Sequence, residues 1–123
     1  MAMQESGEMY LETIYVLSQR LPSVRSIDVA AEMGFSKPSV SRGLGILKNT
    51  GLAITDASGN IFLTEEGTKR AKKIYERHTV LSELFKLIGI SEETADDDAC
   101  RVEHYISDET FKALKKHLKE LKK

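Results

Sequence analysis

The chain has 123 residues, of which 41% are hydrophobic and 30% are charged, and its formal net charge is −1. This length predicts one compact domain or two very small ones, and the composition excludes an intrinsically disordered chain. No apolar run reaches the roughly 18 residues of a membrane span, and the first residues lack a signal-peptide pattern. We therefore expect a cytoplasmic protein without a membrane partner, and the single cysteine, which cannot form an intramolecular disulfide, agrees with that compartment.

The small net charge conceals a segregation of charge along the chain. Residues 20–77 carry ten basic and six acidic side chains, residues 78–111 carry two and nine, and residues 112–123 carry six and one. A basic segment followed by an acidic one suggests that the first binds a polyanion and the second a cation. Ordinary solvated helix faces would give the same pattern, so charge alone does not decide between these interpretations.

The first predicted element is a helix of about 15 residues over residues 5–19, ended by Leu21-Pro22-Ser23. Met9 and Glu12 are spaced i, i+3, which places them on one face of this helix, where both could point at one partner. A methionine at such a position is more commonly a core residue, so this pair is weak evidence by itself.

Two shorter helices are predicted next, over residues 26–34 and 36–49, joined by a turn at Gly34-Phe35-Ser36. Ser26 and Ser36 are the expected N-caps, and Pro38 is tolerated in a first turn. This order predicts a helix-turn-helix, although a plain helical hairpin with a polar outer face has a similar pattern. The small, polar and basic side chains near the start of the second helix are Lys37, Ser39, Ser41 and Arg42.

A short hairpin follows the two helices. Residues 52–55 and 60–63 have the pattern of strands, and Asp56-Ala57-Ser58-Gly59 between them is a good turn sequence. A helix-turn-helix followed by a hairpin is a winged helix, so the sequence predicts a nucleic-acid-binding domain.

The second half of the chain is predicted to be entirely helical. Thr64 is the expected N-cap of a helix that reaches about residue 88, and its apolar surface exceeds the needs of a small winged helix, which suggests packing against a second copy of the chain. A further helix is expected over residues 92–106, and Ser107-Asp108-Glu109 should cap the last one.

The sequence Cys100-Arg101-Val102-Glu103-His104 has the composition of a metal site. On a helix, Cys100, Glu103 and His104 fall at i, i+3 and i+4, so a thiol, a carboxylate and an imidazole share one face. These donors suit a divalent transition metal better than calcium or magnesium. The alternative is that Cys100 is a small buried hydrophobic residue beside an ordinary exposed Glu-His pair.

Over nearly its whole length the sequence resembles the metal-dependent repressors of the diphtheria toxin repressor and manganese transport regulator family. The resemblance implies a winged-helix domain over residues 1–72 and a helical metal-binding and dimerisation domain over residues 73–123. It further implies Fe(II)- or Mn(II)-activated binding of a homodimer to double-stranded operator DNA that controls metal-homeostasis genes. The matching segments begin at Glu8, Ser36, Arg77, Asp98 and Ser107, and they read EMYLETIY, SKPSVS, RH, DACRVEH and SDE.

The resemblance also implies metal ligands. Four residues fall on the primary site of the iron-responsive members, and they are Met9, Cys100, Glu103 and His104. Glu12 and His78 resemble ligands of the manganese-responsive members, whereas the ancillary site has Ser82 in place of the expected acid and Asp96 in place of the expected histidine. The soft donors favour Fe(II), with Mn(II) as the alternative, and other divalent transition metals should substitute in vitro.

Two other functions are alternatives to this one. A metal-independent winged-helix regulator would use Cys100 as a redox-sensing thiol or as a core residue, and a small metalloenzyme would need a separate base and a substrate pocket, which the sequence does not supply. We therefore expect no enzymatic activity and no small-molecule substrate. Phosphate contacts are expected from Arg25 and Lys37 and base contacts from Arg42. The full set of expected DNA contacts is Arg25, Ser36, Lys37, Pro38, Ser39, Ser41 and Arg42.

Overall fold

The computed structural model describes residues 5–123, which are mostly helical with one small antiparallel hairpin, as the sequence predicts. The chain divides into two compact units, residues 1–72 and 73–123. Among the described residues, no helix combines the length and apolar character needed to cross a lipid bilayer. In chain order the elements are α1 (Glu5–Arg20), α2 (Ser26–Met33), α3 (Lys37–Asn49), β1 (Ala53–Thr55), β2 (Ile61–Leu63), α4 (Glu65–Leu87), α5 (Glu92–Val102) and α6 (Asp108–Leu121).

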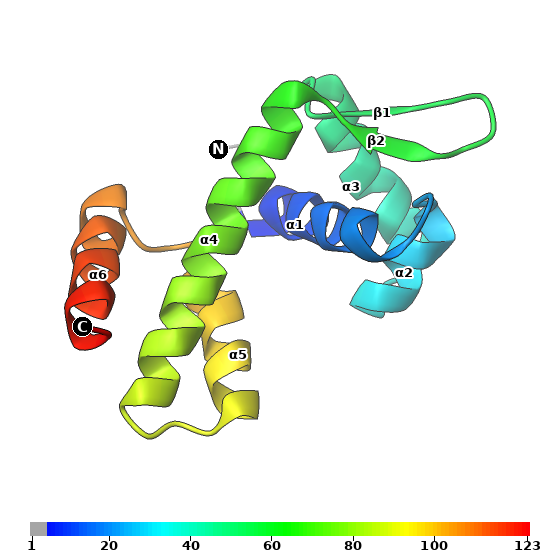
Figure 1. The fold of residues 1–123 in the computed structure, drawn as a ribbon. Helices are drawn as coiled ribbons and strands as arrows, with labels where there is room; N and C mark the ends of the chain where they lie inside the picture. The colour runs from blue at the N-terminus through cyan, green and yellow to red at the C-terminus, as the bar shows by residue number, and fades with distance from the viewer. Residues whose placement is uncertain (1–4) are drawn as a thin grey trace. The chain divides into compact units, whose positions relative to one another are not determined.

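The first unit is a winged helix, in which α1, α2 and α3 pack on one another beside the hairpin (Figure 1). Each helix contributes one apolar side to the core of this unit, because residues three and four apart on a helix point in the same direction. The side chains of α1, α2 and α3 that are almost completely buried in this core include Leu11, Ile14, Val29, Val40 and Leu47.

Helix α2 begins one residue earlier than a Ser26 cap would require. The N-cap is Arg25, whose backbone N–H donates to the Asp28 carboxylate over 2.9 Å, and Ser26 is the first helical residue. The prediction that Ser26 caps this helix is therefore wrong, because the acidic side chain one turn ahead reaches back to the backbone of Arg25. The helix ends where expected, at Gly34, whose φ of 68° is the left-handed conformation that glycine adopts readily.

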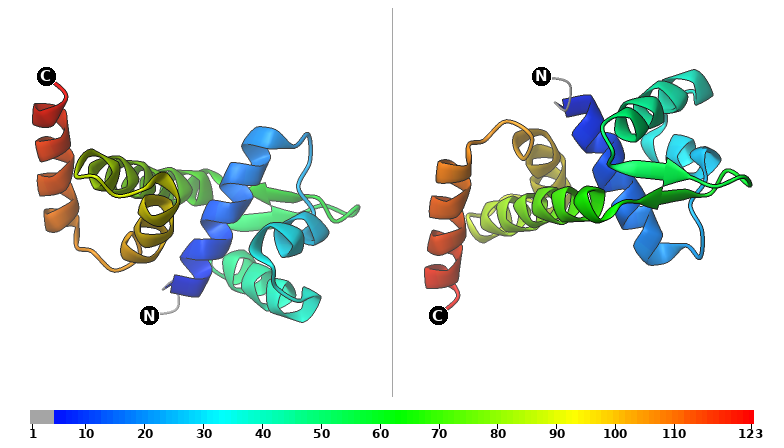
Figure 2. Two further views of the ribbon diagram at one scale, coloured as in Figure 1. Left: turned by 90° about the horizontal axis from the view of Figure 1, so that it is seen from below. Right: turned by 90° about the horizontal axis from the view of Figure 1, so that it is seen from above.

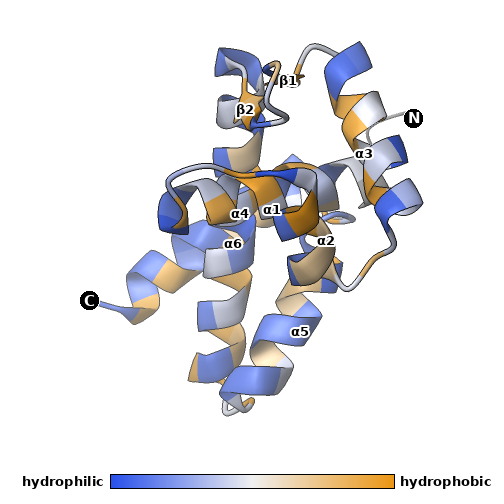
Figure 3. Cartoon of the chain, turned by 90° about the vertical axis from the view of Figure 1, so that its right-hand side faces the viewer, coloured by the Kyte–Doolittle hydropathy of each residue, from blue (hydrophilic) through white to orange (hydrophobic). Residues whose placement is uncertain are grey.

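Helix α3 starts at the predicted cap. The Ser36 hydroxyl accepts the backbone N–H of Ser39 over 3.3 Å, and Pro38 lies in the first turn. Val40, Leu44 and Leu47 are buried, whereas the side of the helix that carries the basic residues near its N-terminus is exposed. Hydrophobic and hydrophilic residues therefore alternate along α3 (Figure 3).

The hairpin pairs β1 with β2 in an antiparallel register, with Ala53 opposite Leu63. The segment before α2 adds to it, since the Ile61 N–H donates to the carbonyl of Val24 over 2.7 Å. Asp56 closes the turn by accepting the backbone N–H groups of Ser58 and Asn60, each over 2.9 Å. Hydrogen bonds from the backbone and side chain of Asn60 hold the pKa of Asp56 below its ordinary value.

The second unit is helical, and α5 and α6 pack on different sides of α4 (Figure 2). One side of α4 packs Val80 and Leu84 against Phe111 and Leu118 of α6. The opposite side meets α5, where the Ser82 hydroxyl donates to the Asp96 carboxylate. Val80 and Leu84 face the same neighbour because they lie four residues apart on α4.

Helix α5 is shorter than predicted. It ends at Val102 rather than at residue 106, and residues 103–105 form a turn. The N–H groups of Tyr105 and Ile106 both donate to the carbonyl of Val102, over 3.0 and 3.3 Å, which tightens the backbone after the helix. Ser107 then caps α6 by accepting the N–H of Thr110 over 3.1 Å.

We predict that the hairpin turn loosens when Asp56 is protonated. Its pKa is lowered from 3.8 in the folded chain, so the ionised carboxylate stabilises the turn above that pH, and this contribution is lost as the pH falls through the folded-state value. The amide protons of Ser58 and Asn60 should shift together below about pH 3.8 in an NMR titration. An Asp56→Ala variant that titrates in the same way would contradict this assignment.

Candidate metal centre and DNA-contacting surface

The second unit gathers three metal-ligating side chains at the turn after α5. Glu103 lies between two imidazoles, with Oε2 3.0 Å from Nδ1 of His78 and Oε1 3.3 Å from Nε2 of His104. The side chain of Glu103 is 0% exposed, that of His104 2% and that of His78 24%. The sequence predicted all three as ligands, and the fold of α4 and the turn brings them together.

Burial determines what this group can bind. A carboxylate that leaves water is costly unless charge or hydrogen bonds compensate it. In one neutral tautomer, His78 can donate from Nδ1 to Glu103. Where the facing imidazole nitrogen carries no proton, that nitrogen and the carboxylate oxygen both present lone pairs. A divalent cation would satisfy both, and oxygen with imidazole nitrogen is a donor set that Mn(II), Fe(II) and Zn(II) accept. The residues present therefore fit a transition-metal ion.

Arg77 of α4 holds the turn that carries Glu103 and His104. Its Nη1 donates to the carbonyl of Ile106 over 2.7 Å and to that of Glu103 over 3.3 Å, and its Nη2 pairs with the Asp108 carboxylate. The guanidinium also lies over the Phe111 ring, 5.5 Å from the centroid. The sequence matched Arg77 to the family but indicated no role for it, because its partners are mostly backbone carbonyls that no motif records.

The other residues of the predicted metal set lie on helices α1 and α5. Cys100 is exposed on the last turn of α5. Asp96 accepts a hydrogen bond from Ser82, which is the main reason that its pKa is lowered, and the Lys86 ammonium lies 3.8 Å away. Met9 and Glu12 are both half-buried on α1, one helical turn apart.

The predicted DNA-contacting residues form a connected surface at the start of α3. The Ser36 hydroxyl donates to Ser39 Oγ over 3.0 Å, and Nη2 of Arg42 donates to the same oxygen over 3.2 Å. Lys37, Pro38, Ser41 and Arg42 are exposed. Arg25 is exposed beside the hairpin turn, where its charge contributes to the lowered pKa of Asp56. Polar hydroxyls and cations on an exposed helix suit phosphates and base edges.

A winged helix with such a surface, followed by a helical unit with a buried Glu-His group, defines a metal-responsive DNA-binding regulator. The chain belongs to the iron-dependent repressor family. Residues 2–59 match the family's N-terminal DNA-binding domain, and residues 64–123 match its metal-binding and dimerisation domain. The resemblance seen in the sequence is thereby confirmed.

Individual relatives agree with this assignment. The transcriptional regulator MntR of Escherichia coli O6:H1 is 36% identical over 106 residues, which cover 86% of this chain and 68% of that protein. An uncharacterized HTH-type transcriptional regulator of Methanocaldococcus jannaschii is 31% identical over 122 residues, which cover 98% of each chain. The solved structure of the manganese regulator SloR superposes with a TM-score of 0.81 at 28% identity, over 92% of this chain. The matched region spans 53% of the SloR chain, about half its length.

We predict that Arg77→Lys weakens metal binding without removing a ligand. Lysine keeps the charge but cannot span two carbonyls and a carboxylate, so the turn that carries Glu103 and His104 should lose its fixed geometry. Loss of such a supporting contact should lower Mn(II) affinity by roughly tenfold in a calorimetric titration. Lys115→Ala, which removes the exposed pair with Glu76, is the matched control. Equal affinities in both variants would show that Arg77 does not position the turn.

Proposed function

We propose that this chain is a repressor that binds operator DNA as a homodimer when a divalent metal ion occupies the site around Glu103. The observation that carries the proposal is the burial of Glu103 between two imidazoles, in the turn that Arg77 holds. Glu103 and His104 would be ligands from the second unit. The remaining candidate ligands are Met9, Glu12, His78, Asp96 and Cys100.

We propose Mn(II) as the physiological metal, with Fe(II) as the alternative. The buried donors are a carboxylate oxygen and imidazole nitrogens, which suit Mn(II), and two of the relatives above are named as manganese or Mnt regulators. The soft donors Met9 and Cys100 favour iron, but Cys100 is exposed. This order reverses the preference that follows from the sequence.

The proposed switch works through linkage rather than folding. Each unit buries an apolar core of its own, so the protein should fold without metal. Ligands on α1 together with Glu103 and His104 would tie the DNA-binding unit to the dimerising one when metal binds. A metal shifts such an equilibrium only by its differential affinity for the two states, and DNA must raise metal affinity by the same factor.

The homodimer is supported by apolar side chains that the second unit leaves exposed, which include Leu87, Ile88, Tyr105 and Leu121. Exposed apolar side chains on a small unit are an indication of a protein interface. A two-fold dimer presents two copies of α3, so the operator should contain two half-sites separated by about one helical turn, or by a multiple of it.

We predict that Glu103→Gln abolishes metal-stimulated DNA binding and leaves the fold intact. Glutamine keeps the volume but removes the charge that a divalent cation needs. Fluorescence anisotropy with a duplex selected by the wild-type protein should show no response to Mn(II), while circular dichroism and the sedimentation coefficient stay unchanged. Glu109→Gln, an exposed acid in the first turn of α6, should behave as wild type.

Two outcomes would count against the switch. A Glu103→Gln protein that still responds to Mn(II) would remove Glu103 from the site, and one that unfolds would make the site structural. A wild-type protein that binds the duplex equally well with a chelator and with Mn(II), but not after thiol oxidation, would favour the metal-independent regulator that senses redox state through the exposed Cys100.

We predict different losses from Arg42→Ala and Lys37→Ala. Arg42 is the expected base contact, so its removal should cost about 1–3 kcal/mol on the selected duplex and relax specificity. Lys37 should contact phosphate, so its removal should weaken binding to all sequences and reduce the slope of log K against log salt by about one. Lys48→Ala, in the last turn of α3, is the control. Identical salt slopes and identical specificity in all three variants would contradict the assignment.

A further inference from the structure

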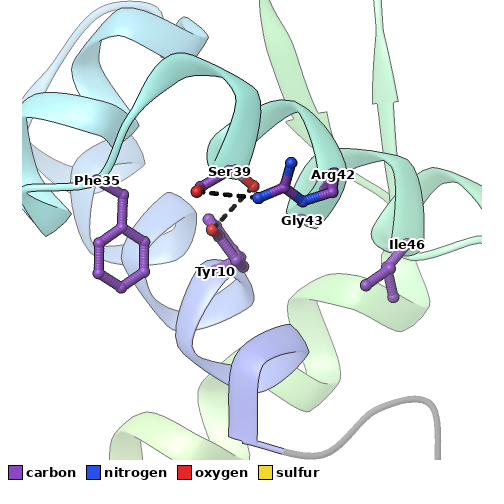
Figure 4. A pocket seen from close by; sticks show the side chains of 6 residues that line it. All are labelled: Tyr10, Phe35, Ser39, Arg42, Gly43 and Ile46. Atoms are coloured by element: carbon purple, nitrogen blue, oxygen red, sulfur yellow. Dashed lines mark hydrogen bonds between the residues drawn. The ribbon is translucent and has the colours of Figure 1, made fainter.

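Tyr10 joins α1 to α3 through an unusually close contact. Its side chain is 5% exposed, and its ring lies against Gly43 in the middle of α3 (Figure 4). A Cβ built on Gly43 would overlap the ring, lying within 2.6 Å of its Cζ atom. The ring can therefore occupy this place only because residue 43 has no side chain. A shift of the ring toward α3 would push directly against the backbone of the helix.

The hydroxyl group of Tyr10 extends this contact to the DNA-contacting surface. It donates to the carbonyl of Ser39 over 3.0 Å, in a partly buried position. The Ser39 hydroxyl oxygen accepts from Arg42 over 3.2 Å, as the dashed lines in Figure 4 show. One buried side chain of α1 thus touches the residue that holds the guanidinium of Arg42.

The surroundings of Tyr10 make the contact adjustable. Phe35 lies on another side of the ring, with centroids 6.0 Å apart and an edge-on angle of 66°. A pocket of about 370 Å³ opens beside the contact and is lined by Tyr10, Phe35, Ser39, Arg42, Gly43 and Ile46. The pocket leaves room for the Tyr10 ring and the Arg42 side chain to take other positions once the hydrogen bond to Ser39 is lost.

The position of Tyr10 in the sequence connects it to the proposed ligands. It directly follows Met9 and lies two residues before Glu12, within one turn of α1. A helix moves as a rigid element over such a distance, and Leu11 and Ile14 bury the same segment in the core of the unit. A force on Met9 or Glu12 therefore acts on the Tyr10 contact as well.

We propose that Tyr10 is a positioning residue for DNA recognition: through Ser39 and Gly43 it holds α3 so that Arg42 points at base edges. This inference rests on the proposed function, and it adds the route by which the position of α1 reaches the residues that read DNA. Tyr10 itself contacts neither metal nor DNA in this mechanism.

The first test removes the hydroxyl alone. Tyr10→Phe should lower the affinity of the Mn(II)-loaded protein for the selected duplex by about 3- to 10-fold, the range expected for one hydrogen bond. Affinity for a scrambled duplex and affinity for Mn(II) without DNA should stay unchanged. Tyr15→Phe is the matched control, because Tyr15 lies on the same helix but lines a different pocket with β2. A merely structural role would lower Tm without changing the ratio of specific to non-specific affinity.

The second test uses the close approach at Gly43. Gly43→Ala should lower specific affinity by more than tenfold, whereas Gly45→Ala, whose added methyl meets nothing within 4 Å, should not. In the double variant Tyr10→Ala with Gly43→Ala the overlap is gone, so its loss should be smaller than the product of the two single losses.

The outcomes separate the inference from the function on which it rests. Wild-type specificity in both Tyr10→Phe and Gly43→Ala, or strictly multiplicative losses in the double variant, would overturn the role of Tyr10. The proposed function fails instead if the wild-type protein shows the same specific affinity with Mn(II) and with a chelator, and the comparison of Tyr10→Phe with wild type still decides whether Tyr10 positions Arg42.

Discussion

The buried carboxylate of Glu103 is the constraint on which the second unit depends. A charge without compensation in that position would cost on the order of several kcal/mol, so neighbouring groups must offset it. His78 and His104 supply imidazole nitrogens at 3.0 and 3.3 Å, and Arg77 fixes the backbone of the same turn through two carbonyls. The same need for compensation would make Glu103 a metal ligand in the proposed site, because one divalent cation could offset its buried charge.

In the first unit, close packing rather than charge fixes the contact between α1 and α3. Tyr10 reaches α3 because Gly43 presents only backbone, and its hydroxyl group is satisfied by the carbonyl of Ser39. A helix that carries candidate ligands is thereby held directly against α3, the helix that we propose contacts DNA. Metal chemistry and base recognition can then influence one another without any change in the fold of either unit, which is what a reversible regulator requires.

Most of the fold could be predicted from local patterns. The caps at Ser36, Thr64 and Ser107, the glycine at position 34 and the turn at Asp56 each act within a few residues, and the structure confirms them. The two errors arose where a contact overrode the pattern. Asp28 moved the cap of α2 from Ser26 to Arg25, and α5 stopped at Val102, beside carbonyls that Arg77 binds from α4.

By itself the sequence determined the class of protein, the order of its elements and the residue types that can bind metal or DNA, because helix caps, periodicity and motif spacing are local properties. Only the tertiary structure decided how those residues are grouped. It buried Glu103 with His78 and His104, left Cys100 exposed, and put Tyr10 against Gly43, a glycine that no local pattern marks as a contact. The pairing of Glu103 with His78 and that of Tyr10 with Gly43 join residues 25 and 33 positions apart. They follow from how the helices pack, which the spacing along one helix does not encode.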